Sequence, residues 1–198
     1  FMTTASGVVK RVQTNEFINA KTRGIIGLKL HDGDKLISAV QTDGSSEIIL
    51  VTRRGKALRF AEDSVRPMGR ASAGIKGMKL SEGDEVTGAV IVTDDSTILL
   101  LTEKGYGKRV RFEDFNPHGR GTSGQRIFGN TESRGEIIGL ISVQDSDEIV
   151  CMTSQGKTLR VLAKTINQQG TGSTGVTVVK ISEPDFLVGL DKVPDNKN

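Results

Sequence analysis

The chain of 198 residues carries 27 basic and 24 acidic residues, a formal net charge of +3, and one cysteine. A single cysteine excludes a disulfide within the chain and fits a reducing compartment. No apolar run approaches the length of a transmembrane helix, which needs about 20 residues. With 24 glycines and no tryptophan, the composition favours short strands and tight turns over a helical bundle.

The first element in the chain is a short segment that recurs three more times. In each copy a threonine is followed three residues later by a glycine, and the glycine four residues later by an arginine. The glycines, Gly7, Gly55, Gly105 and Gly156, are 48, 50 and 51 residues apart. A fixed period of this length is typical of repeat architectures, in which one supersecondary unit is copied and stacked.

Two strands flank each of these segments. Apolar runs at residues 48–51, 98–101 and 149–152 precede the threonine and predict strands that are buried on both faces. The first unit lacks most of this run. The glycine predicts a tight hairpin turn with positive φ. The strand after it alternates, so that Leu58 and Phe60 share one face and Arg59 takes the other.

Two further strand signals complete each unit. Residues 24–30 match residues 74–80 almost one for one, and counterparts begin at Gly124 and Gly175. A fourth signal follows an acidic turn, at residues 33–40, 83–90, 135–140 and 184–190. Only residues 62–65 are expected to form a helical turn. Four short strands in about 50 residues are typical of a propeller blade, so we predict an all-β fold with four blade equivalents.

Several short motifs, in order and at this period, resemble the C-terminal domain of the gyrase A protein of DNA gyrase, and more loosely that of topoisomerase IV. They are Gly33-Asp34, Arg59-Phe60, Ser64-Val65-Arg66-Pro-Met-Gly69, Gly83-Asp84, Gly105-Tyr106-Gly107-Lys108-Arg109 and Val188-Gly189-Leu190. The resemblance implies a β-pinwheel, a propeller-like disc whose neighbouring blades exchange strands. It also implies that double-stranded DNA bends around the basic rim of the disc.

The resemblance further implies the place of this domain in a larger enzyme. It would be the non-catalytic DNA-wrapping domain of gyrase, a bacterial cytoplasmic and nucleoid-associated type II topoisomerase that uses ATP to supercoil DNA negatively. Its protein partners would be the rest of gyrase A and gyrase B. The basic glycine-rich motif of gyrase is absent, which leaves topoisomerase IV as an alternative. We expect residues 1–193 to form a partial domain without its upstream blades, followed by a tail at residues 194–198.

The connector between the second and third strands is the strongest candidate for DNA contact. Its cations are Lys21 and Arg23 in the first unit, Arg66 and Arg70 in the second, and His118, Arg120 and Arg126 in the third. The fourth copy, residues 167–175, has none. Basic loops at equal spacing suit a bent phosphate backbone, whose contacts position DNA without reading sequence. Ordinary solvated loop charge is the structural alternative.

A second group of cations recurs in register. The arginines Arg11, Arg59, Arg109 and Arg160 follow the hairpin glycines, and the lysines Lys29, Lys79 and Lys180 follow the third-strand glycines. The lysines are secondary candidates for DNA contact. Two interpretations of the arginines stay open. They point outward to phosphates, or they pair between blades with acidic turn residues such as Asp34 and Asp84.

Other functions find less support in the sequence. Residues 119–124 and 170–175 match the dinucleotide-binding pattern, but both lead into a predicted strand instead of a helix, so we predict no cofactor. His31, His118 and Cys151 lie in different units, and Tyr106 lies in a turn, so we predict no catalytic or metal site. A protein-interaction propeller remains an alternative, although few aromatic residues are available for an exposed patch.

Overall fold

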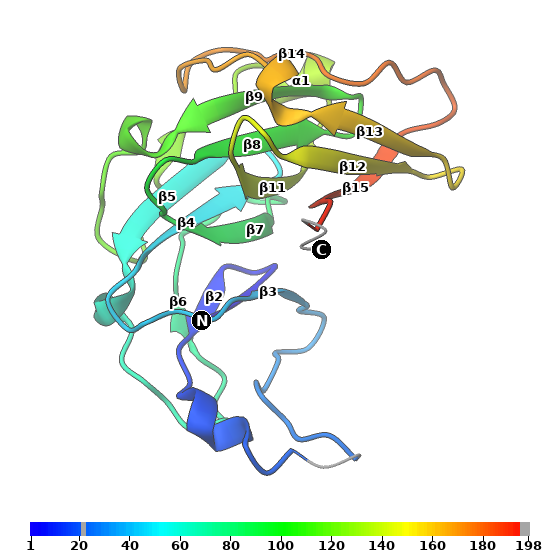
Figure 1. The fold of residues 1–198 in the computed structure, drawn as a ribbon. Coiled ribbons are helices and arrows are strands. Elements are labelled where there is room, and N and C mark those ends of the chain that lie inside the picture. The colour runs from blue at the N-terminus through cyan, green and yellow to red at the C-terminus, as the bar shows by residue number, and fades with distance from the viewer. Residues whose placement is uncertain (21–22, 195–198) are drawn as a thin grey trace.

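The computed structural model describes residues 1–20 and 23–194, which form four small antiparallel sheets that follow one another in an arc (Figure 1). The first sheet has the order β3 (Leu36–Ala39), β1 (Met2–Thr4), β2 (Val8–Lys10), β6 (Ile75–Lys76). The second has the order β10 (Gln125–Arg126), β5 (Lys56–Ala61), β4 (Glu47–Thr52), β7 (Val86–Ile91). The third has β11 (Ile137–Val143), β8 (Thr97–Thr102), β9 (Tyr106–Arg111), β14 (Val176–Thr177), and the fourth β13 (Thr158–Leu162), β12 (Glu148–Thr153), β15 (Leu187–Lys192). The all-β prediction with four blade equivalents is confirmed.

Neighbouring sheets exchange one strand. The third strand of each repeat leaves its own sheet and pairs with the second strand of the preceding repeat, as β6 does with β2, β10 with β5 and β14 with β9. The strand exchange that the resemblance implies is therefore present. Since each exchanged strand lies in the sheet of its neighbour, consecutive repeats cannot separate without breaking backbone hydrogen bonds.

The prediction of a third strand at residues 24–30 is wrong. These residues form no strand, because by the exchange rule their partner would belong to a preceding repeat, which is not among the residues of this chain. The other copies are also shorter than predicted, with two residues each in β6, β10 and β14. A segment forms a strand only where it has a hydrogen-bonded partner strand. The sequence similarity between the copies extends beyond the residues that have such a partner.

The repeated threonine and glycine build the same hairpin turn in every sheet. In the second repeat the N–H of Gly55 donates to the carbonyl oxygen of Thr52 (3.1 Å), and Thr52 Oγ1 accepts from the N–H of Lys56 (3.2 Å). Gly55 has a φ of 81°, a conformation that favours glycine. Asp84 of the acidic turn accepts from the N–H of Arg54 (3.1 Å) and ties the two turns together. The predicted hairpins are confirmed.

Short helical turns recur in each repeat, whereas only one was predicted. They are η1 (Thr14–Phe17), η2 (Glu62–Ser64), η3 (Phe112–Asp114) and η4 (Ala163–Thr165), and the third repeat adds α1 (Thr131–Arg134). The predicted turn at residues 62–65 corresponds to η2. Single turns of three or four residues are too short to show a helical period, which explains why the others escaped prediction.

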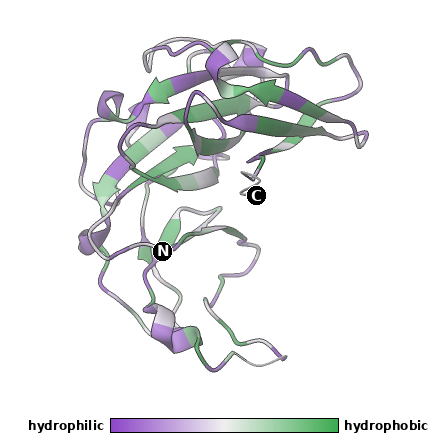
Figure 2. Ribbon diagram, in the orientation of Figure 1, coloured by the Kyte–Doolittle hydropathy of each residue, from purple (hydrophilic) through white to green (hydrophobic). Residues whose placement is uncertain are grey.

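The core consists of three apolar clusters, one between each pair of neighbouring sheets. In β4, Ile48 and Leu50 pack with the first sheet, whereas Ile49 and Val51 pack with the third. Figure 2 shows the hydrophobic residues along these strands and the hydrophilic ones in the loops. The strands β3, β7, β11 and β15 pack against one another at the centre of the arc. The exchanged strands and the connectors therefore lie on its outer rim.

Candidate nucleic-acid interface

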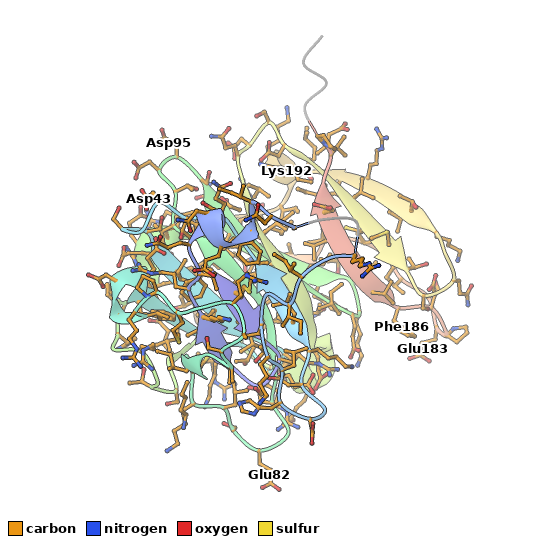
Figure 3. The ribbon with its side chains drawn as sticks, turned by 90° about the horizontal axis from the view of Figure 1, so that it is seen from below. Asp43, Glu82, Asp95, Glu183, Phe186 and Lys192 are labelled. Carbon is orange, nitrogen blue, oxygen red and sulfur yellow. The ribbon has the colours of Figure 1, made fainter. Side chains whose placement is uncertain are left out.

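The connectors wrap the outer edge of the preceding sheet. Each begins with a helical turn. In the second, third and fourth repeats the connector then makes an isolated parallel bridge at or next to the second strand of the repeat before it: Pro67 to Arg11, Pro117 to Arg59 and Gln168 to Arg109. The loops that precede the buried first strand of a repeat lie on one face of the arc, and the acidic turns lie on the opposite face. Figure 3 shows Asp43 and Asp95 of these loops on one side and Glu82 and Glu183 of the acidic turns on the other. The connectors run between these faces, along the rim.

Several predicted DNA contacts lie exposed on this rim. Arg23, Arg66, Lys79 and Arg126 are exposed, and none takes part in an ion pair within the described residues. Arg126 lies in β10, the outermost strand of its sheet. Lys21 lies outside the described residues.

The sequence analysis did not name the exposed rim cation Lys76. It occupies in β6 the position that Arg126 has in β10, two residues after a glycine with positive φ. This shared register was visible in the sequence, because Gly74 and Gly124 are 50 residues apart. Two successive sheets thus carry a cation on their outermost strand.

Arg70 and Arg120 are half-buried and reach back toward the preceding repeat. The guanidinium of Arg70 donates to the carbonyl oxygen of Ile26 (3.2 Å) and lies 3.8 Å from the Glu16 carboxylate. The guanidinium of Arg120 donates to the carbonyl oxygens of Lys76 and Ser64, the latter at 3.3 Å. Both arginines therefore hold their connector in place with part of their donors.

The arginines of the second strands are buried in the joints between repeats. The side chains of Arg11, Arg59 and Arg109 are 17%, 16% and 6% exposed. Arg59 pairs with Glu47 and donates to the carbonyl oxygens of Phe112 (2.9 Å) and Phe115 (3.3 Å). Arg109 pairs with Asp145 and donates to the carbonyl oxygen of Ile166 (2.8 Å). The guanidinium of Arg11 lies 3.6 Å from the Glu62 carboxylate and donates to the carbonyl oxygen of Gly44 (3.0 Å). Arg160, which has no following repeat in this chain, is 68% exposed.

Of the two interpretations left open for these arginines, pairing in the joints between repeats describes Arg11, Arg59 and Arg109, but the paired carboxylates are not those of Asp34 and Asp84. The carboxylate of Asp34 accepts from the N–H and hydroxyl of Ser6, and that of Asp84 from the N–H of Arg54. Hydrogen bonds from Ser6 hold the pKa of Asp34 below its usual value, although burial opposes the shift. The acidic turns are thus used to fix the hairpins, and other carboxylates neutralise the arginines.

Two fully buried lysines, Lys10 and Lys108, also face the connectors, and the sequence analysis missed both. Lys108 Nζ donates to the carbonyl oxygens of Gly170 (2.8 Å), Thr171 (3.1 Å) and Ser173 (3.1 Å). Burial lowers the pKa of Lys108 to about 8. A lysine at a strand position where the second repeat has Leu58 was the signal available in the sequence.

The centre of the arc has a different chemistry. A hollow there is lined by residues of β3, β7, β11 and β15, such as Ser38, Thr87 and Leu140, and by no titratable side chain.

Burial raises the pKa of the Cys151 thiol to about 11. Within the described residues, no three His, Cys, Asp or Glu side chains gather as metal ligands would, and no helix has the length and apolar character to span a membrane. The glycine-rich residues 119–124 and 170–175 lead into β10 and β14.

Comparisons with known sequences give one consistent result. The family described as "DNA gyrase C-terminal domain, beta-propeller" matches residues 1–43, 46–93, 96–144 and 147–194. The gyrase A protein of Treponema pallidum is 64% identical over 193 residues, which cover 98% of this chain and 24% of that protein. The gyrase A protein of Salmonella typhimurium is 37% identical over 195 residues, covering 98% and 22%. The chain thus spans about a quarter of the length of these relatives.

Solved structures show the same fold. A structure of the DNA gyrase A C-terminal domain matches with a TM-score of 0.87 and 31% identity, covering 96% of this chain and 64% of that one. The C-terminal domain of a DNA topoisomerase IV matches with a TM-score of 0.90 and 28% identity, covering 97% and 60%.

Proposed function

Because this chain belongs to the family of DNA gyrase C-terminal domains, we propose that it binds double-stranded DNA and bends it around the outer rim of the arc. The observation that carries the proposal is a row of exposed rim cations that form no ion pair within the described residues: Arg23, Arg66, Lys76, Lys79 and Arg126. They come from three successive repeats, and a curved phosphate backbone can meet them in turn.

The binding is electrostatic and independent of sequence. Lysine and arginine side chains on a rim contact phosphates, which carry no sequence information. Smooth bending of 20–30 base pairs by 40–90° costs on the order of 1–6 kcal/mol, so several phosphate contacts have to offset it. The half-buried Arg70 and Arg120 keep the connectors in position and present their remaining donors. Arg11, Arg59 and Arg109 act within the joints between repeats.

In the whole enzyme, this domain supplies the DNA wrap and no catalytic residue. The rest of gyrase A and gyrase B are its partners in a bacterial, cytoplasmic, nucleoid-associated topoisomerase that hydrolyses ATP and supercoils DNA negatively. Residues 1–193 act as the DNA-binding unit. The remaining residues, 194–198, are its tail, of which 195–198 lie outside the described residues.

Two alternative functions are distinguished from this proposal. One is the corresponding role in topoisomerase IV, because a C-terminal domain of a DNA topoisomerase IV has the same fold. A protein-interaction role has one observation in its favour: exposed apolar side chains gather on the end sheets, including Leu36 and Ile37 in β3 and Val188 in β15. These residues lie away from the rim, so rim variants distinguish the two roles.

The proposal is tested by measuring duplex binding as a function of salt. If about five phosphates are contacted, the slope of log K against log salt is about −4 to −5. A triple variant with Arg66, Lys76 and Arg126 replaced by Gln should bind much more weakly. The matched control replaces Arg53, Arg54 and Lys104, which lie in the hairpin turns, and removes the same charge. Equal loss in both variants, or no binding by the unaltered chain at about 50 mM salt, would refute the rim as the DNA site.

A further inference from the structure

Residues 167–175 of the fourth connector carry no basic side chain, yet they lie on a buried cation. Lys108 in β9 is fully buried, and its ammonium group donates to three carbonyl oxygens of residues 170–173 and to the Ser173 hydroxyl (3.0 Å). No carboxylate is among these hydrogen-bond partners. The charge of Asp114 acts on the ammonium through space, and the ring centroid of Phe128 lies 5.3 Å from Nζ, but neither takes up one of its hydrogen bonds. The positive charge therefore remains available to an anion above the connector.

The direction of these carbonyls fixes the direction of the neighbouring amides. In a trans peptide the C=O and N–H groups point to opposite sides, and within the described residues the one cis peptide is Glu183–Pro184. Because the carbonyls of residues 170, 171 and 173 point inward to Lys108, the N–H groups of Thr171, Gly172 and Thr174 point outward. None of these three donates a hydrogen bond within the described part of the chain.

The surface above these amides is open. Gly172 is exposed, and the positions that a Cβ atom would take at Gly170 and Gly172 have no other atom within 4 Å. A hollow beside them is lined by Arg111, Asp114, Gln168, Gln169 and Gly170. Arg111 adds an exposed cation, 3.5 Å from the Asp114 carboxylate. Sets of outward main-chain amides form anion-binding concavities in proteins.

The same arrangement occurs two repeats earlier. Lys10 is also fully buried, and its Nζ donates to the carbonyl oxygens of Arg70 and Ser72, the latter at 3.0 Å. The N–H groups of Ala71 and Ala73 accordingly point outward, and neither finds an acceptor within the described residues. In the second repeat the equivalent position is occupied by Leu58. A buried lysine thus underlies two of these connectors.

We propose that residues 170–174 form a phosphate-binding site, in which the main-chain amides of Thr171, Gly172 and Thr174 hold phosphate oxygens above the buried Lys108. The proposal rests on the proposed function, since it takes the phosphate from the backbone of duplex DNA. It extends the DNA path to residues 167–175 of the fourth repeat, whose side chains carry no charge.

The test follows backbone amide signals of the whole chain by NMR, during titration with a 20-base-pair duplex and, separately, with inorganic phosphate. With the duplex, the amide protons of Thr171, Gly172 and Thr174 should shift downfield, whereas that of Gly156 in a hairpin turn should not. If amides near Arg66 and Arg126 shift and these three do not, the site is wrong while the proposed function stands. If no rim amide shifts, the proposed function fails. A response to inorganic phosphate alone would rule out DNA as the source.

Two readouts separate binding from a structural role. Gly172→Asp puts a carboxylate into the open space and should weaken duplex binding several-fold, with a salt slope smaller in magnitude by about 0.9. Gly172→Ala fills the same space without charge and should bind normally. The pKa of Lys108, measured by NMR, should rise when the duplex binds, because a phosphate favours the charged ammonium. Equal binding by the two glycine variants, or an unchanged Lys108 pKa, would overturn the proposal.

Discussion

Arg59 in β5 of the second repeat donates a 2.9 Å hydrogen bond to the carbonyl oxygen of Phe112 in η3 of the third repeat. The bond joins residues 53 positions apart in the chain. The guanidinium also pairs with Glu47 on the neighbouring strand of its own sheet. An arginine at a repeated position thus links each blade to the next, and its charge is already neutralised.

Replacing Arg59 with Met should lower the free energy of unfolding by about 2–4 kcal/mol, because Glu47 and two carbonyl oxygens lose a largely buried partner. The matched control is Arg160→Met at the same position of the fourth repeat, where the side chain is 68% exposed. A surface ion pair contributes about 0–1 kcal/mol. Urea unfolding measures both. Equal losses would contradict the assignment of Arg59 to the joint.

A methyl group at Gly105 should be far more disruptive than one at Gly156. Both glycines have positive φ, 81° and 77°, so Ala strains the backbone equally. At Gly105, however, the new Cβ would clash with the carbonyl oxygen of Val179, whereas at Gly156 nothing lies within 4 Å. Gly105→Ala should therefore cost about 1–3 kcal/mol more in unfolding experiments. Similar costs would show that the segment exchanged from the fourth repeat does not pack closely there.

The stability of the protein should rise with alkaline pH through Lys108. Burial lowers its pKa from 10.5 to about 8 in the folded state, so between pH 8 and pH 10.5 the unfolded chain binds more protons than the folded one. Stability then increases with pH in this window. Urea unfolding at pH 7 to 10 should show the increase relative to Lys108→Met, in which this group is absent. A constant difference between the two proteins would mean that Lys108 keeps an ordinary pKa.

Lys76 should contribute to DNA binding although its sequence motif did not single it out. Replacing it with Gln should reduce the magnitude of the salt slope by about 0.9 if it contacts one phosphate. Lys104→Gln, an exposed lysine in a hairpin turn, serves as the control and should leave the slope unchanged. Fluorescence anisotropy with a labelled duplex gives both slopes. A Lys76 variant with an unaltered slope would remove β6 from the DNA path.

Much of the fold could be predicted because its signals are local. Residues 52–56 contain the groups that form the hydrogen bonds within the hairpin turn, and the alternation from Lys56 to Phe60 indicates which side chains of a single strand are buried. The third strand shows the limit of such reasoning. Residues 24–30 and 74–80 have nearly the same sequence, but only the second copy has a strand to pair with, so only it contains a strand.

The candidate site was less predictable, for a related reason. Arg66 and Arg109 look alike as basic residues in a repeat, yet Arg66 is exposed, whereas Arg109 is buried against the carbonyl oxygen of Ile166. The sequence around Lys108 does not show that three carbonyl oxygens surround its ammonium group. Which cations meet solvent depends on the connector of the next repeat, about fifty residues away.

The amino-acid sequence alone determined the period, the hairpins and the all-β class, because these depend on residues within a few positions of one another. The tertiary structure alone decided which sheet each third strand completes and which cations remain exposed on the rim. Both outcomes depend on hydrogen bonds between repeats, such as those of Arg59 to Phe112 and of Lys108 to Gly170. A partner in another repeat leaves no local pattern, and only folding brings the two together.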